Sequence, residues 1–246
     1  MMRLPAMRPM TNLTADCLLM ELRKFARPDK AAFLPFFFQC LPGGYGEGDQ
    51  FLGVIVPDQR KIAKAFRQMP LKELSLAFRS PWHESRLTAL FVLVHQFEKS
   101  KDSQRATLYE FYLDHLDYVD NWDLVDSSAR HIVGEYVLEH YDNRRILFEL
   151  ASSDQLWRQR VAVVGTQALI NKHEFLEIKK LAKLFLKHPH DLIHKAVGWM
   201  LREMGQIDGE QLVFFLEQNA KKMPRTMLRY AIEKLSKEER KKFMEH

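Results

Sequence analysis

Apolar residues recur at intervals of three and four along almost the whole chain, which is the period of an α-helix. Residues 87–97 (LTALFVLVHQF) and 192–204 (LIHKAVGWMLREM) show this pattern most clearly. The strict alternation of apolar and polar positions that marks a half-buried strand is scarce. The pattern therefore predicts an all-α protein.

Short polar turns separate the helical segments. Asp, Ser and Pro gather in them, as in RPDK from residue 27, SPWHES from residue 80 and KHPHD from residue 187. These residue types suit helix N-termini, because a side-chain oxygen or the missing N–H of proline relieves the unpaired donors of the first turn. The turns are short enough for consecutive helices to pack as pairs.

Four helical segments share one layout, in which a turn is followed by a basic residue, a small residue and an aliphatic stripe. Their first residues are Pro81, Asp154, His190 and Pro224, at successive spacings of 73, 36 and 34 residues. A period of about 35 to 40 residues is typical of two-helix units stacked as an α-solenoid of HEAT-like repeats. We predict a tail over residues 1–12 and a single HEAT-like α-solenoid domain over residues 13–246.

One segment, residues 40–61 (CLPGGYGEGDQFLGVIVPDQRK), departs from the helical pattern. It holds five of the ten glycines of the chain. Such a cluster predicts a loop that turns sharply or approaches another group closely. No Gly-Lys-Ser/Thr follows, so this is not a phosphate-cradling loop. A tight connection and a ligand-contacting loop both stay open.

The composition favours a globular protein with an anionic partner. The chain has 246 residues, of which 46% are apolar, and this is enough to bury a sizeable core. The formal net charge is +5 and the pI is about 9.1. Nine basic and four acidic residues follow residue 220, an excess equal to the net charge of the whole chain. This concentration at one end favours an anionic polymer over a small acidic metabolite.

The cysteines, the apolar runs and the N-terminal residues together indicate in which cellular compartment the protein is expected. Cys17 and Cys40 lack the spacing of metal ligands, so we interpret them as free thiols in a reducing environment. No apolar run approaches the roughly 18 residues that a membrane-spanning helix needs. The first residues lack the unbroken apolar stretch of a signal peptide. We expect a cytoplasmic protein without membrane contact.

Carboxylates cluster around Trp122. Asp120 or Asn121 can cap a helix that begins near Trp122. Asp123 falls in the first turn of that helix, where the helix dipole favours an acid. Asp126 has no such explanation; it lies four residues after Trp122 and so shares its face. This pair is either an exposed contact or the wall of a pocket.

A second tryptophan, Trp199, follows Gly198 inside a predicted helix. A glycine there costs about 1 kcal/mol relative to alanine, so it usually permits a close approach. Trp199 is therefore either a core residue beside a packing notch or a functional aromatic. Arg160, close behind Trp157, is expected to project at one edge of its helix, beside a buried stripe of valines.

Arg160 has counterparts at similar places early in other repeated helices. They are Arg86, Lys195 and Arg229. Corresponding positions of a solenoid line up along its concave surface. A row of basic residues there would suit phosphates, and we expect a concave basic face.

Other catalytic chemistry finds no pattern in the chain. The closest histidine pair, His188 and His190, is split by a proline, and there is no HExxH motif, so we expect no bound metal. The serines lie in no nucleophile elbow. Carboxylate chemistry framed by tryptophans is the remaining option for an enzyme.

Three motifs occur in order: NWDLVDSSARHIVG from residue 121, SSDQLWRQRVAVV from residue 152 and HKAVGWMLREMG from residue 194. Together they resemble the AlkD-like DNA alkylation repair glycosylases, which are built of HEAT-like repeats. The similarity runs from residue 46 to residue 235. The glycine-rich loop is longer than in the best-known members, and the first 25 or so residues lie outside the resemblance.

The resemblance implies which residues form the site. The Trp-x-x-x-Asp pattern of the family falls on Trp122 and Asp126, and its second aromatic falls on Trp199, so these three are the candidate catalytic residues. Its arginine falls on Arg160. The candidate DNA-binding residues are Arg160, Arg202, Arg60, Lys195 and Arg229. One departure is that some members carry two adjacent tryptophans where this chain has Asn121-Trp122.

The function that the resemblance implies is hydrolysis of the N-glycosidic bond of cationic alkylpurines, such as 3-methyladenine and 7-methylguanine, in double-stranded DNA. It implies a monomer without a cofactor, which acts without extruding the base into a tight pocket. Two alternatives stay open. One is a non-catalytic binder of damaged or branched DNA, and the other is an α-solenoid scaffold for protein partners.

Overall fold

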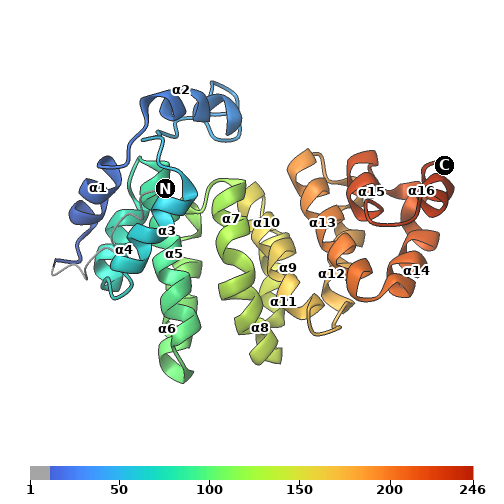
Figure 1. Ribbon diagram of the computed structural model, residues 1–246. Helices are drawn as coiled ribbons and strands as arrows, with labels where there is room; N and C mark the ends of the chain where they lie inside the picture. The colour runs from blue at the N-terminus through green and yellow to red at the C-terminus, as the bar shows by residue number, and fades with distance from the viewer. Residues whose placement is uncertain (1–11, 246) are drawn as a thin grey trace, which may run out of the picture. The chain divides into compact units, whose positions relative to one another are not determined.

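The computed structural model describes residues 12–245, and within them all regular elements are helices (Figure 1). The only β-type pairing among these residues is an isolated bridge between Gln50 and Trp82. The all-α prediction is confirmed. The predicted tail over residues 1–12 lies outside the described residues except for its last residue.

Internal contacts divide the chain into two compact units, Met1–Ser128 and Ala129–His246. We call them unit 1 and unit 2 and describe each by itself. The single domain expected over residues 13–246 stays a prediction.

Unit 1 is built around one long helix, α5. Its helices are α1 (Ala15–Arg23), α2 (Pro28–Phe37), α3 (Val56–Ala65), α4 (Leu71–Phe78), α5 (His83–Lys99), α6 (Asp102–Asp114) and α7 (Trp122–Ala129), whose last residue already belongs to unit 2. Helix α5 packs against α3, α4 and α6. Every residue of α5 from His83 to Leu93 is buried, polar ones included. Polar residues buried at its start must therefore have partners, and these build the site described below.

Unit 2 contains a row of equivalent helices. It comprises a π-helical turn at Arg130–Gly134, then α8 (Glu135–Glu139), α9 (Arg145–Ala151), α10 (Leu156–Gly165), α11 (Gln167–Ile170), α12 (Leu176–Leu184), α13 (Asp191–Ile207), α14 (Gly209–Asn219), α15 (Arg225–Ala231) and α16 (Lys237–Met244). Helices α10, α13 and α15 are neighbours in that order (Figure 1). They begin close to the predicted repeat starts, and a row of equivalent helices is the arrangement of an α-solenoid.

Gly198 is the packing notch of α13. A Cβ atom on Gly198 would lie 2.5 Å from the carbonyl oxygen of Met227 and 2.5 Å from the Cβ of Tyr230, both on α15. Only a hydrogen in place of a side chain lets the two helices approach this closely. The structure therefore shows Gly198 as a packing notch at which α13 and α15 approach closely.

Replacing Gly198 with alanine is expected to lower the free energy of unfolding by about 1 to 3 kcal/mol, because overpacking against a backbone carbonyl outweighs the gain in helix propensity. Urea unfolding measures this change. Gly209→Ala is the matched control, since a Cβ at Gly209 meets nothing within 4 Å. Equal unfolding midpoints for the two variants would contradict the tight contact.

Among the described residues, no helix is both long enough and apolar enough to cross a bilayer.

Candidate functional site

Helix α7 presents the predicted aromatic and acidic pair on one face. Trp122 is its first residue and Asp126 lies one turn further on, and both side chains are half-buried. Residues four apart on a helix are neighbours on its surface. The side-chain oxygen of Asn121 accepts a hydrogen bond of 2.8 Å from the backbone N–H of Trp122. The helix therefore begins where the sequence predicted.

Two phenylalanines hold the indole of Trp122. The ring of Phe38 stacks on it at 5.3 Å between centroids and an interplanar angle of 28°, and the ring of Phe37 meets it edge-on at 5.8 Å. Phe38 is buried, but Phe37 and its neighbours Phe33 and Phe36 on α2 are exposed. This contribution was not predicted from the motifs, although the aromatic run in AAFLPFFFQC is its signal in the sequence.

Asp126 lies beside a buried phenol. Tyr112 is fully buried, and its hydroxyl lies 2.9 Å from the hydroxyl of Ser128, which donates to the carbonyl of Leu124. Burial, and then the negative charge of Asp126, raise the pKa of Tyr112 well above its ordinary range. Tyr112 therefore stays protonated beside Asp126.

Asp120 and Asp123 do more than start a helix. A carboxylate oxygen of Asp123 lies 2.8 Å from Nε2 of His83, and the Arg86 guanidinium donates to Asp120 at 3.2 Å. His83 and Arg86 both lie in the first turns of α5. Both also contact Asp49 of the glycine-rich segment, at 2.6 Å from His83 and 2.8 Å from Arg86. These ion pairs connect the start of α7 to α5.

His83 carries its charge well above neutral pH. Burial alone lowers its pKa, but the carboxylates of Asp123 and Asp49 outweigh burial and raise the pKa to about 9. Since carboxylates only accept hydrogen bonds, an imidazole bonded to one at each ring nitrogen must donate from both.

The free energy of unfolding is therefore expected to depend on pH through His83. A raised folded-state pKa stabilises the fold fully below the unfolded value of 6.5, and this contribution disappears as pH rises through about 9. The loss is on the order of 3 kcal/mol. Chemical unfolding at pH 6.5 and pH 9.5 tests this, with His83→Gln as reference. An equal pH dependence in both proteins would contradict it.

The glycine-rich segment is fixed to α5 by Glu84. This carboxylate is 1% exposed and accepts hydrogen bonds from the backbone N–H groups of Leu52, Gly53 and Val54, at 2.7 to 3.2 Å. Gly53 has a φ of +82°, and a Cβ there would lie 2.1 Å from the carbonyl oxygen of Arg27. The segment is therefore an ordered connection with a defined path.

In unit 2, Trp199 and Arg202 share one acidic partner, Glu203. The indole N–H of Trp199 donates to Glu203 at 3.0 Å. Arg202 pairs with Glu203 at 3.4 Å and closely with Glu233 of the segment after α15. Trp199 is half-buried, which keeps part of its ring accessible.

Arg160 does not project at an edge of its helix, and that expectation was wrong. It is 5% exposed, and its guanidinium donates to the carbonyl oxygen of Leu192 at 2.7 Å. Leu192 lies in the first turn of α13, so Arg160 joins two helices of the row. The valine stripe predicted beside it is buried. No sequence pattern predicts this backbone partner, because the two residues are 32 positions apart.

The other predicted basic residues are more accessible. Lys195 is half-buried and pairs with Asp191 one turn earlier at 2.9 Å. Arg229 is exposed and lines a shallow hollow of about 380 Å³. Lys237, Arg240 and Lys241 also line this hollow. Four basic groups against one acidic group, Glu233, give this surface a positive excess.

Arg60 lies in unit 1 on α3. It is exposed, and its guanidinium carbon lies 4.1 Å from the ring centroid of Phe91. A cation held over an aromatic face keeps its charge at a fixed place.

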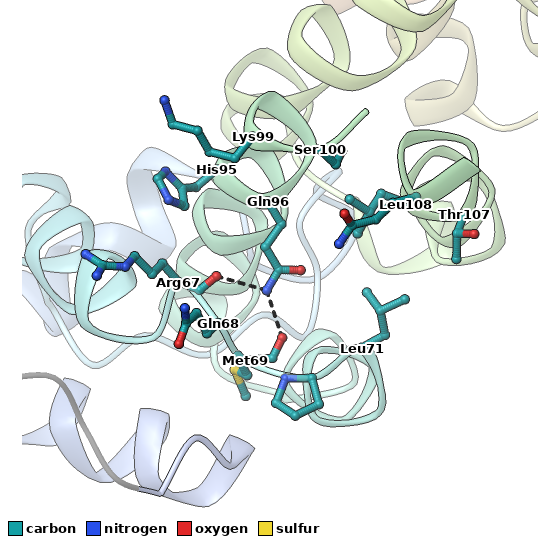
Figure 2. A pocket seen from close by; sticks show the side chains of 12 residues that line it. Arg67, Gln68, Met69, Leu71, His95, Gln96, Lys99, Ser100, Thr107 and Leu108 are labelled. Carbon is teal, nitrogen blue, oxygen red and sulfur yellow. Dashed lines mark hydrogen bonds between the residues drawn. The ribbon is translucent and has the colours of Figure 1, made fainter. Parts of the chain in front are cut away.

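A separate pocket of unit 1, of about 490 Å³, lies at the far end of α5. Figure 2 shows Arg67, His95 and Lys99 around it, with the Gln96 amide donating to the carbonyls of Arg67 and Met69 at 3.1 and 2.8 Å. Helix α5 is 17 residues long, which is about 25 Å, and the contacts toward Trp122 are at its other end. This pocket is therefore not part of the candidate site.

Within residues 12–245, the side chains of His, Cys, Asp and Glu form no group of three or more suited to hold a metal ion.

Comparison with known proteins identifies the family. The family model described as DNA alkylation repair enzyme matches residues 18–235. The chain therefore belongs to the DNA alkylation repair enzyme family, and the resemblance in the sequence motifs is confirmed. A comparison with curated proteins found no match.

A solved structure shares the fold. It is described as a predicted DNA alkylation repair enzyme from Enterococcus faecalis. The two chains are 18% identical over 86% of this chain and 97% of that one, with a TM-score of 0.69. At this identity the likeness concerns the architecture, and it agrees with the α-solenoid class.

Proposed function

We propose that this protein is a DNA glycosylase that hydrolyses the N-glycosidic bond of cationic alkylpurines, such as 3-methyladenine and 7-methylguanine, in duplex DNA. The observation that carries the proposal is the pair on α7. In a member of the DNA alkylation repair family, a half-buried Asp126 shares a helix face with a Trp122 held by stacked aromatic rings.

The chemistry suits a single carboxylate. Alkylation at N3 or N7 gives the purine a positive charge, so it leaves without much help from a general acid. As the glycosidic bond stretches, positive charge grows on the deoxyribose. The Asp126 carboxylate would stabilise this oxocarbenium-like state and orient the attacking water. The nearby Tyr112 phenol stays protonated, so it adds no second negative charge beside Asp126.

The tryptophans would contribute through their electron-rich faces. An indole face attracts a cation by about 0.5 to 2 kcal/mol, and the cationic base and sugar are both suitable partners. Trp122 is fixed for this role by Phe38 and Phe37. Trp199 is fixed by its hydrogen bond to Glu203, and a neighbouring carboxylate makes its surroundings more negative.

Basic residues of both units would bind the DNA backbone. We assign this role to Arg60, Arg160, Lys195, Arg202 and Arg229. The hollow beside Arg229, with three further basic residues, supports an extended anionic partner. Because Arg160 is nearly buried and donates to the carbonyl of Leu192, we expect it also to orient the start of α13.

The direct test is release of free bases. Purified protein is mixed with methylated duplex DNA, and free 7-methylguanine and 3-methyladenine are measured by mass spectrometry against DNA incubated alone. Release above that background is the expected result. A folded protein that binds the DNA and releases neither base would favour a non-catalytic binder of damaged or branched DNA.

The affinity for DNA is expected to fall by about two to three orders of magnitude between 50 and 200 mM salt, because about five phosphates are neutralised. Fluorescence anisotropy measures this, and Arg229→Gln should reduce the slope by about one. Arg145→Gln, on the exposed side chain of α9, is the control. Weak salt dependence of all three proteins would instead fit a scaffold for protein partners.

A further inference from the structure

His83 contacts the start of α7 and the glycine-rich segment at the same time. It is 2% exposed, its Nδ1 lies 2.6 Å from Asp49, and its Nε2 lies 2.8 Å from Asp123. A ring with a carboxylate at each nitrogen donates two hydrogen bonds and cannot rotate without losing one of them. The residue after Trp122 is therefore tied, through its side-chain carboxylate, to the first turn of α5.

The same ring supports the indole of Trp122 through one intervening residue. Phe38 lies 4.8 Å from the His83 ring and 5.3 Å from the Trp122 ring, while Phe51 stacks on His83 at 4.9 Å. An imidazolium is attracted to the faces of both phenylalanines. His83 thus constrains α7 twice, through Asp123 and through the ring stack.

The glycine-rich segment brings Asp49 to this place. Gln50 accepts a hydrogen bond of 2.8 Å from the backbone N–H of His83 and donates one of 3.3 Å to the carbonyl oxygen of Pro81. Gly46 permits the approach of the segment, since a Cβ there would lie 2.7 Å from the carbonyl oxygen of Phe38. The glycine-rich segment is therefore held against the start of α5, where it places Asp49 beside His83.

The charged and titratable groups that interact with His83 or with its partner Asp49 come from three elements. Asp49 and Cys40 belong to the glycine-rich segment, Asp120 and Asp123 belong to α7 and its lead-in, and Arg86 belongs to α5. The Cys40 thiol is neutral at physiological pH, because burial and then Asp49 raise its pKa to about 11. Against the three aspartates, Arg86 and protonated His83 supply two positive charges, and His83 is the one of the two that contacts both Asp49 and Asp123.

We propose that His83 is a positioning residue of the glycosylase site: bridging Asp49 and Asp123 beneath Phe38, its imidazolium fixes the orientation of Trp122 and, through α7, of Asp126. This inference rests on the proposed function for its catalytic consequence. The structural part, orientation of Trp122, is independent of activity. The glycine-rich segment acts in it as the carrier of the second carboxylate.

The first measurement is made on the ring of Trp122 itself. The four tryptophans are labelled with 5-fluorotryptophan, and the Trp122 signal in the 19F spectrum is assigned with Trp122→Phe. In the wild type, this signal is expected to shift as pH rises through about 9. In His83→Gln, the signal should be displaced at pH 7 and lose that titration.

The second measurement is the single-turnover release of 7-methylguanine at pH 7. His83→Gln should lower the rate by about tenfold to a hundredfold, with DNA affinity unchanged, because a misplaced catalytic group costs that much. His95→Gln, on the same helix but beside the pocket of Figure 2, is the matched control and should leave both readouts unchanged. The double variant His83→Gln/Asp123→Asn, which retains a neutral hydrogen bond, should recover part of the rate.

Each outcome decides the proposal. If His83→Gln changed neither the 19F signal of Trp122 nor the rate of 7-methylguanine release, the positioning role of His83 would be overturned. If the wild type releases no base, the proposed function fails, while the 19F titration still decides whether His83 positions Trp122. Should His83→Gln not fold, Asp49→Asn takes its place. That variant leaves the Asp123 contact intact and should give a smaller change of the same kind in both readouts.

Discussion

Replacing Asp126 with asparagine is expected to lower the single-turnover rate of 7-methylguanine release by about 100-fold to 1,000-fold while leaving DNA binding intact. The change removes one charge and keeps the shape of the side chain. A preorganised charge facing a developing cation contributes about this much to a rate, and asparagine can neither stabilise the cation nor orient a water as a base. The nearby Tyr112 cannot substitute, because its pKa is raised and it stays protonated.

The measurement is made with protein in excess over a duplex containing one lesion. Asp114→Asn, which changes an exposed aspartate at the end of α6, is the matched control for a lost negative charge. Anisotropy on the same duplex separates binding from catalysis. An Asp126→Asn protein as fast as the wild type would remove this carboxylate from the mechanism.

Replacing Glu84 with alanine is expected to destabilise the protein by about 4 kcal/mol or more. The backbone N–H groups of Leu52, Gly53 and Val54 would lose their acceptor inside the protein. Each buried donor left without a partner costs about 1 to 3 kcal/mol, and the deleted side chain also leaves a cavity. Because these amides fix the glycine-rich segment, the Asp49 contact with His83 should weaken as well.

Urea unfolding with tryptophan fluorescence measures this loss. Glu84→Gln keeps one acceptor oxygen in place and should lose less than half as much stability as the alanine variant. Glu110→Ala, at an exposed position of α6, is the control for removing a glutamate from a helix. If Glu84→Ala were no less stable than Glu110→Ala, the segment would not depend on this carboxylate.

The fold could be predicted from the sequence because it depends on local patterns. The three-and-four spacing of apolar residues predicts helices, and the starts of α10, α13 and α15 follow from repeated turns before basic residues. The contact of Gly198 could not be predicted from the sequence, since it is made with α15, and only the position of that helix shows which atoms the glycine approaches.

The candidate site was only partly predictable. Trp122 and Asp126 are four residues apart on one helix, so local spacing places them together. His83, in contrast, meets Asp49 and Asp123 across separations of 34 and 40 residues, and neither motif reading nor charge counting connects them. Arg160 was expected to be exposed at the edge of its helix, but it is buried. Its partner is a backbone carbonyl, which no sequence pattern reveals.

The proposed mechanism requires that the Asp126 carboxylate promotes hydrolysis of N-glycosidic bonds only to bases that already carry a positive charge. The most direct measurement compares, in one experiment, release of 7-methylguanine and of neutral 8-oxoguanine from otherwise identical duplexes under single-turnover conditions. We expect release of the cationic base, loss of that release in Asp126→Asn, and no release of the neutral base. Equal release of both bases, or release of neither by a folded protein that binds both duplexes, would contradict it.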